Sequence, residues 1–280
     1  MRIGLNLVMV RPDAMPGIAA RAEALGYESV FVPDHLFFPS RVASRYPYTP
    51  DGSFPYAPST PLFDPWLVLT NIAAGTRRIK LGTAVYVLPL RHPFVTARAV
   101  TTLDVLSGGR AVLGVGAGWL TEEFTGLGLD ARTRFSRTEE AIAVIRALWT
   151  ETEVSFHGKH FAFDGVCFEP KPVTSPHPPI LLGGDTDQAL ARAVRAADGW
   201  ISAGTTATVE SRVAKITELR AELGATRPFE LTVLHPSPSV AELSRYADIG
   251  VDRVVVMPWQ RGRDAVAGLE AFAADVLGAR

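Results

Sequence analysis

The stretch IKLGTAVYVLPLRHPFVTARAVTTLDVLSGGRAVLGV (residues 79–115) contains a complete unit of strand, helix and strand. Its apolar runs predict strands at 79–86 and 111–115. Between them, His92-Pro93 supplies a helix start and Ser107-Gly108-Gly109 supplies the end of that helix. Because this order builds a parallel sheet covered by helices, the stretch predicts an α/β fold.

The same alternation continues in both directions along the chain. Eight strand and helix pairs can be counted in 280 residues, and a closed (β/α)8 TIM barrel needs roughly 250 residues. We therefore expect a closed barrel with insertions, with an open doubly wound sheet as the alternative. The strands are expected at residues 3–8, 29–32, 79–86, 111–115, 180–182, 200–202, 229–234 and 253–257.

Helix starts and ends are marked by familiar capping residues. Asp64-Pro65 supplies an N-cap followed by a proline at the first helical position. Ser136 with Glu139, and Ser239 with Glu242, have the spacing of a capping box and predict two further helix starts. The remaining helices are expected near 15–25, 188–197, 209–223 and 264–277.

Two segments interrupt the alternation within what we expect to be one domain, residues 1–280. Residues 37–63 are rich in proline and aromatic residues and follow the second strand, which favours a lid; an ordered surface loop is the alternative. Residues 152–178 are expected to form a β-hairpin insertion, with short strands at 154–156, 161–163 and 166–168.

Composition excludes several classes of protein. The 28 basic and 29 acidic residues nearly cancel, so no global field favours nucleic acid or an anionic membrane. Cys167 is the single cysteine, which excludes an intramolecular disulfide and fits a cytoplasmic location. No H-E-x-x-H spacing or carboxylate cluster supports a metal, and no run of 18 apolar residues occurs.

Active sites of such barrels lie at the carboxyl ends of the strands, so the residues there are the candidates. Asp34-His35 ends the second strand, and a histidine at this place can move a proton near neutral pH. The glycines at 114, 116 and 118 do not form a dinucleotide motif, because Trp119 stands where its third glycine belongs. Residues 183–186 form a second glycine-containing corner, a candidate anion site in which Asp185 is alternatively the N-cap.

The residues that hydrolases and glycosidases require are not found at the strand ends. No G-x-S-x-G motif is present, and Asp34 is the one acidic residue clearly placed at a strand end, which disfavours hydrolase and glycosidase chemistry. The rim is instead apolar, aromatic and rich in glycine. Such a rim suits a flat organic cofactor that brings its own reactivity.

Several of these segments resemble the bacterial luciferase-like superfamily, and most closely its F420-dependent oxidoreductase branch. The resemblance covers the first two thirds of the chain in the right order. The segments are AEALGYESVFVPDHL (22–36), RIKLGTAVYVLPLRHP (78–93), TLDVLSGGRAVLGVGAGWLTEEF (102–124), PHPPILLGG (176–184) and ADGW (197–200).

The resemblance implies a TIM-like barrel that holds an isoalloxazine or deazaflavin ring at its carboxyl-end mouth. It also implies a cis peptide bond between Ala84 and Val85, and catalytic roles for Asp34 and His35. Together, the strand ends and the resemblance give as cofactor-binding candidates Asn6, Asp34, His35, Thr83, Ala84, Val85, Gly116, Ala117, Gly118, Trp119, Gly183, Gly184, Asp185 and Thr186.

One residue departs from the pattern. The sugar-phosphate dehydrogenases of this superfamily carry an acidic proton donor after the glycine loop, whereas this chain has Trp119. This departure argues against the same substrate and the same acid. Glu122 and Glu123 follow closely, but glutamates in the first turn of a helix usually complement its dipole.

The resulting expectation is an F420-dependent oxidoreductase that transfers a hydride between the deazaflavin and a small, apolar or planar organic substrate. One alternative is an FMN-dependent monooxygenase supplied by a separate reductase. Another is a cofactor-free barrel with a binding or structural role. The resemblance also implies a homodimer, and neither a nucleic acid nor a membrane is expected as a partner.

Overall fold

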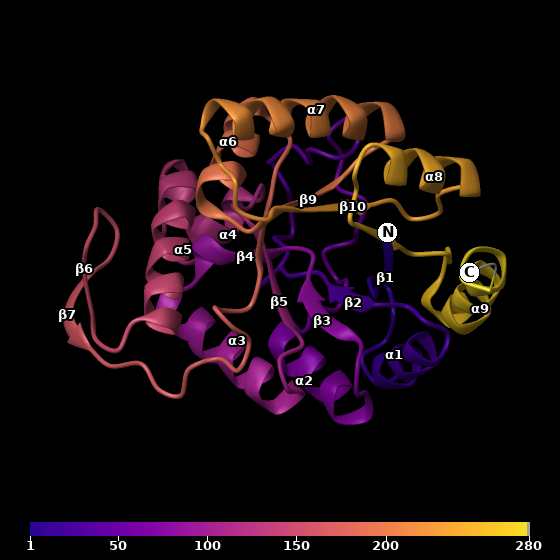
Figure 1. The fold of residues 1–280 in the computed structure, drawn as a ribbon, viewed down its shortest axis with the longest axis horizontal. Coiled ribbons are helices and arrows are strands. Elements are labelled where there is room, and N and C mark those ends of the chain that lie inside the picture. Colours follow the sequence, from indigo (N-terminus) through magenta and orange to yellow (C-terminus); the bar gives the residue numbers. More distant parts are fainter. Residues whose placement is uncertain (279–280) are drawn as a thin grey trace.

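The computed structural model describes residues 1–278, which fold into a closed parallel barrel (Figure 1). The strands follow the order β3-β2-β1-β11-β10-β9-β8-β5, and β3 also pairs with β5, which closes the ring and excludes an open sheet. The expected domain 1–280 includes residues 279 and 280, which lie outside the described residues. The barrel strands are β1 (Arg2–Asn6), β2 (Ser29–Val32), β3 (Lys80–Thr83), β4 (Tyr86–Val87), β5 (Ala111–Gly116), β8 (Ile180–Gly183), β9 (Gly199–Ala203), β10 (Glu230–Leu234) and β11 (Arg253–Val256).

The prediction of one continuous strand at 79–86 is wrong, because the structure has two shorter strands there. β3 and β4 both pair with β5, and they are separated by Ala84 and Val85. The peptide bond between these two residues is cis, as the resemblance implies. The break therefore lies at the carboxyl-end mouth of the barrel, where β3 ends.

Helices surround the strands on the outside of the barrel (Figure 1). Asp64 caps α2 through hydrogen bonds to the backbone N–H groups of Trp66 and Leu67, and Ser239 with Glu242 forms the expected capping box. The capping box predicted at Ser136 is wrong, since that residue lies inside α5. The helices are α1 (Met15–Ala24), α2 (Pro65–Gly75), α3 (Pro93–Ser107), α4 (Thr121–Gly126), α5 (Arg134–Thr150), α6 (Asp187–Ala196), α7 (Thr206–Glu222), α8 (Val240–Asp248) and α9 (Ala265–Val276), with 3-10 turns at Leu88–Leu90, Ala131–Thr133 and Gly262–Asp264.

The second insertion is a two-stranded hairpin that stands outside the ring of helices, at the left of Figure 1. β6 (Val154–His157) pairs with β7 (Ala162–Val166). The third strand predicted at 166–168 is absent among the described residues, because β7 runs through the expected turn at Gly165, which adopts a φ of +61°.

The amino-terminal end of the barrel is closed by a buried ion-pair network. Arg253 is 2% exposed and binds the carboxylates of Glu28 and Glu230. Burial lowers the pKa of Arg253, but the two carboxylates outweigh it and raise this pKa above its ordinary value. The interior above the network is filled by the side chains of Phe31, Val112, Leu181, Ile201 and Val255.

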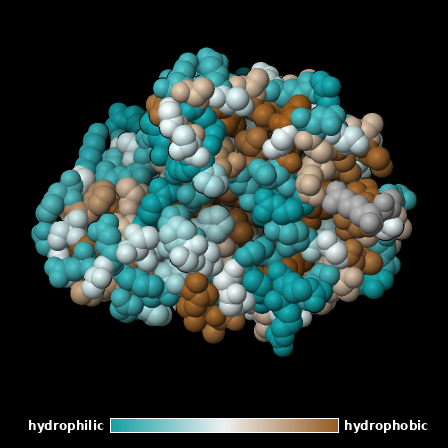
Figure 2. Space-filling model, viewed as in Figure 1, coloured by the Kyte–Doolittle hydropathy of each residue, from teal (hydrophilic) through white to brown (hydrophobic). Residues whose placement is uncertain are grey.

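Hydrophilic residues are interspersed with smaller hydrophobic areas on the face shown in Figure 2. Within residues 1–278, the helices are too short or too polar to cross a membrane. The same residues contain no group of three or more His, Cys, Asp or Glu side chains placed to hold a metal ion.

Candidate active site

Asp34 is buried at the end of β2, where its carboxylate binds the guanidinium of Arg91 through both oxygens. The Nη1 to Oδ2 and Nη2 to Oδ1 distances are 2.5 and 2.8 Å, and the N–H of Val87 donates to Oδ2 at 2.9 Å. Burial lowers the pKa of Arg91, but Asp34 outweighs it and raises this pKa above its ordinary value. Asp34 thus fixes the chain just after the break between β3 and β4.

His35 points its ring at a different carboxylate. Its Nδ1 lies 2.8 Å from Oε2 of Glu123 in α4, and the N–H of Leu36 donates to Oε1 of Glu123 at 2.7 Å. The Glu123 side chain is 0% exposed and that of His35 is 17% exposed. The interpretation of Glu123 as a residue that complements the helix dipole is therefore corrected, since it is a buried partner of His35.

Sequence reasoning placed Glu123 near the site without assigning it a role there. The available signal was its position four residues after Trp119, which occupies the place of the acid in the sugar-phosphate dehydrogenases of this superfamily. Trp119 precedes α4 and Glu123 lies in the first turn of that helix, so the start of α4 carries this carboxylate beside the glycine loop.

Glu122 faces the first insertion, residues 37–63, which contains no helix or strand. Its carboxylate accepts hydrogen bonds from the N–H groups of Ala43 (2.6 Å) and Ser44 (3.0 Å) and from Oγ of Ser44 (2.7 Å). Burial raises the pKa of Glu122, but these hydrogen bonds outweigh it and lower this pKa to about 2. The ionised carboxylate thus fastens the first insertion to α4.

A folded pKa below the ordinary value of 4.5 means that this fastening is complete above pH 4.5 and is lost as the pH falls toward 2. We expect pepsin cleavage within residues 37–63 to rise steeply, relative to cleavage elsewhere, between pH 4 and pH 2. Glu122→Gln should be cleaved there readily at pH 4, whereas Glu139→Gln, on the surface of α5, should behave as the wild type. Equal cleavage of all three proteins at pH 4 would refute the anchoring role.

Aromatic rings from the first insertion cover His35. The rings of Phe38 and Phe54 lie 5.1 and 6.2 Å from the His35 ring, and Trp119 lies 5.9 Å from it. Trp119 also contacts Phe54 at 4.9 Å and Tyr46 at 5.0 Å. The insertion and the glycine loop after β5 therefore meet over the histidine.

Glycines make room for the break between β3 and β4. A Cβ on Gly116 would lie 2.5 Å from Cγ2 of Val85, and one on Gly183 would lie 3.6 Å from its Cγ1. Ala84 and Val85 also pack against the interior cluster. The Oγ1 of Thr83 donates to the carbonyl of Gly114 at 2.7 Å, which ties the break to β5. The candidates 83–85, 116–119 and 183–184 are thus brought together at one mouth.

The remaining candidates have partners of their own. Thr186, not Asp185, is the N-cap of α6, with its side chain accepting from the N–H of Ala189 at 3.2 Å. Asp185 instead accepts from Oγ of Ser202 and lies 3.4 Å from Nε of Arg212. Asn6 accepts from the N–H of Val8 at 3.0 Å, within its own loop.

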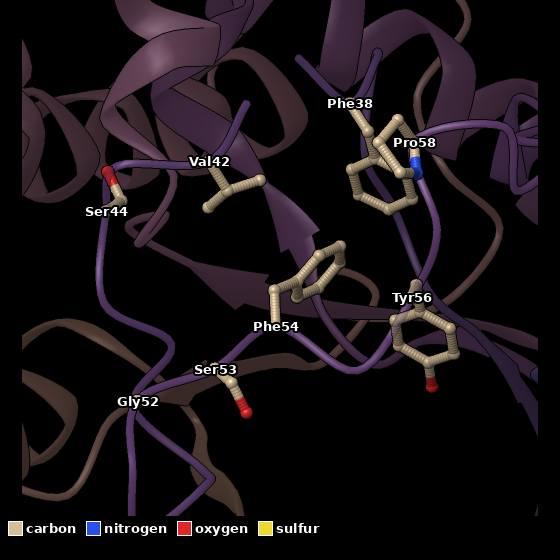
Figure 3. Close-up of a pocket in the computed structure, with 8 residues that line it drawn as sticks. All are labelled: Phe38, Val42, Ser44, Gly52, Ser53, Phe54, Tyr56 and Pro58. Atoms are coloured by element: carbon tan, nitrogen blue, oxygen red, sulfur yellow. The ribbon is translucent and has the colours of Figure 1, made fainter. Parts of the chain in front are cut away.

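Two cavities adjoin this region. One, of about 260 Å³, lies within the first insertion and is called the aromatic cavity below (Figure 3). The other, of about 370 Å³, lies beyond β9 and β10, with Tyr48 of the first insertion and His235 in its lining. The aromatic cavity is lined by Phe38, Val42, Ser44, Gly52, Ser53, Phe54, Tyr56 and Pro58.

The fold and this site define an enzyme that works at the carboxyl-end mouth of a parallel barrel. The chain belongs to the luciferase-like monooxygenase family, whose pattern matches residues 5–248. The protein is thus a flavin- or deazaflavin-dependent oxidoreductase, since the family uses F420 or reduced FMN.

Similar proteins come from both cofactor groups. The chain is 35% identical over 278 residues to an uncharacterized protein of Mycobacterium tuberculosis (strain ATCC 25618 / H37Rv), covering 98% of each chain. It is 35% identical over 195 residues to the F420-dependent glucose-6-phosphate dehydrogenase of Nakamurella multipartita, covering 68% of this chain and 52% of that protein. It is 32% identical over 157 residues to the FMNH2-dependent dimethylsulfone monooxygenase of Pseudomonas putida, covering 55% and 42%.

Solved structures confirm the barrel. The monooxygenase RslO1 from Streptomyces bottropensis superposes with a TM-score of 0.81 at 21% identity, covering 100% of this chain and 99% of that one. An F420-dependent secondary alcohol dehydrogenase in complex with an F420-acetone adduct gives a TM-score of 0.78 at 19% identity, with the same coverage.

Proposed function

We propose that the protein is an F420-dependent oxidoreductase that transfers a hydride between the deazaflavin and a small, uncharged organic substrate. The buried pair of His35 and Glu123 carries this proposal. Interconversion of an alcohol and a carbonyl compound moves one hydride and one proton, and the pair is built to handle the proton. The longer match to the F420-dependent relative, 68% of the chain against 55% for the FMNH2-dependent one, supports F420.

The mouth fits a flat ring. At position 116 a Cβ would lie 2.5 Å from Cγ2 of Val85, so glycine lets the two segments approach closely there, and Gly183 lies on the other side of Val85 within ordinary contact distance of Cγ1. We propose that Ala84, Val85 and the loop 116–119 hold the ring, with Asn6 and Thr83 at its border and residues 183–186 toward its phosphate. Bound F420 would supply the hydride transfer.

The chain itself would position the proton. In neutral His35, the contact with the Glu123 carboxylate places the hydrogen on Nδ1 and leaves Nε2 as the acceptor. His35 is therefore the proposed proton carrier, Glu123 its positioning residue and Asp34 a positioning residue for the break, while the first insertion acts as a lid that excludes water.

The match to the FMNH2-dependent relative supports a second candidate function, a monooxygenase that receives reduced FMN from a separate reductase. The same mouth would then hold the isoalloxazine ring. The homodimer implied by the resemblance stays a prediction.

Titration of the purified protein with F420 and with FMN, each followed by its own fluorescence, separates the candidates. We expect quenching that saturates with F420 and a much weaker response to FMN. Tight binding of FMN alone would overturn the F420 proposal and favour the monooxygenase. Binding of neither would favour the cofactor-free barrel.

A further inference from the structure

We propose that the aromatic cavity receives an uncharged aromatic ring of the substrate. This inference rests on the proposed function, because it assigns a chemical class of substrate to the same active site. It adds a binding subsite made entirely by the first insertion.

The walls of the cavity connect it to the proposed proton carrier. Phe38 and Phe54 line the cavity, and the same two rings contact His35 at 5.1 and 6.2 Å. Figure 3 shows the Phe54 ring between Val42 and the rings of Phe38 and Tyr56. A group bound in the cavity would therefore contact the same two rings that contact His35.

The size and shape of the cavity suit a planar ring. Its volume is about 260 Å³, and a protein cavity of about 150 Å³ lined by apolar side chains already accepts benzene. Phe54 meets Phe38 at 4.8 Å and Tyr56 at 5.3 Å, with interplanar angles of 65° in both cases. Rings set at such angles offer both edges and faces to an incoming aromatic group.

The charges around the cavity disfavour an anion. None of its lining residues is charged, and Ser44 of the lining is held by the Glu122 carboxylate. Arg45 approaches Gly52 with its Nη2 donating to the carbonyl of Asp51, and it is not itself a lining residue. A sugar phosphate would give up hydration in this cavity without a charged lining residue to pair with, whereas an uncharged aromatic ring has no charge to desolvate.

The class of ligand can be tested by calorimetric titration of the full-length protein, with and without F420. We expect acetophenone to bind about 2- to 10-fold more tightly than cyclohexyl methyl ketone, which has the same skeleton without the aromatic ring. Benzoate and glucose 6-phosphate should bind more weakly still. Equal affinity for the saturated ketone, or tighter binding of either anion, would overturn the inference.

The place of binding can be tested with variants that fill the cavity or open its wall. Val42→Trp should weaken acetophenone binding by about tenfold or more, because the larger side chain occupies the cavity. Ser59→Trp puts the same residue on an exposed position of the insertion outside the lining and should bind as the wild type. If Val42→Trp does not fold, Tyr56→Leu decides: it should reduce the preference for acetophenone over the saturated ketone, and an unchanged preference would contradict the inference.

The two proposals fail separately in this design. Binding of F420 without acetophenone binding, or acetophenone binding that Val42→Trp leaves unchanged, would remove the subsite and keep the oxidoreductase. Acetophenone binding that depends on Val42 without binding of F420 would keep the subsite and remove the proposed cofactor.

Discussion

His35→Ala should lower the turnover of the F420-loaded enzyme by about 10²- to 10⁴-fold, the usual loss when a proton-transferring side chain is removed. The folded structure should change little, because the ring is partly exposed and, within residues 1–278, its hydrogen bond is to Glu123. Steady-state turnover and thermal unfolding, measured on the same preparation, check both halves of this expectation.

Glu123→Gln and His157→Ala complete the test. Glu123→Gln keeps the shape of the side chain but loses its charge, so we expect lower turnover and a displaced pH profile rather than a uniform loss at every pH. His157→Ala, on the exposed hairpin, should leave turnover unchanged. Full turnover in His35→Ala would remove His35 as the proton carrier, and an unmoved profile in Glu123→Gln would leave Glu123 with a purely structural role.

Asp34→Ala should lower the free energy of unfolding by about 3–5 kcal/mol, as is typical when one partner of a buried ion pair is removed. The Arg91 side chain is 12% exposed and would lose both of its carboxylate contacts, and the N–H of Val87 would lose its acceptor. Urea unfolding followed by circular dichroism measures the difference.

The exposed pair of Arg11 and Asp13 provides the matched control. Its side chains are 83% and 66% exposed, so Asp13→Ala should leave the unfolding midpoint where it is. Arg91→Met removes the other partner of the buried pair. It should also lower the free energy of unfolding, because Asp34 would then be buried without its cation. An Asp34→Ala protein that is as stable as the wild type yet inactive would instead support the direct catalytic role expected from the sequence.

Local patterns were enough to predict the closed barrel and most of its elements. The strand 29–32 was predicted with its observed bounds, because a short buried run is flanked by clear turn residues. The continuous strand at 79–86 was wrong, since its apolar residues do not reveal that the chain leaves the ladder at Ala84 and Val85. Ser136 was misjudged because α5 starts earlier, at Arg134, so the apparent capping pair lies within the helix.

The site was predictable where its residues are adjacent in sequence and not where they are distant. Asp34 and His35 follow from the end of one strand. Their partners, Arg91 and Glu123, lie 57 and 88 residues away in the sequence. No local sequence pattern indicates that His35 pairs with Glu123 and not with the adjacent Glu122. Only the packing of α4 against the mouth reveals that Glu122 and Glu123 face different partners.

These two neighbouring glutamates constrain how the enzyme can be redesigned. Glu122 hydrogen-bonds to the insertion that forms the proposed subsite, and Glu123 orients His35. Replacing residues 37–63 with a foreign loop would therefore also change the surroundings of His35. A loop without donors equivalent to those of Ala43 and Ser44 would leave the Glu122 carboxylate without hydrogen-bond partners from the loop. It would also remove the rings that cover His35. Altered selectivity is therefore better sought by changing Val42, Ser53 or Tyr56 within the native loop.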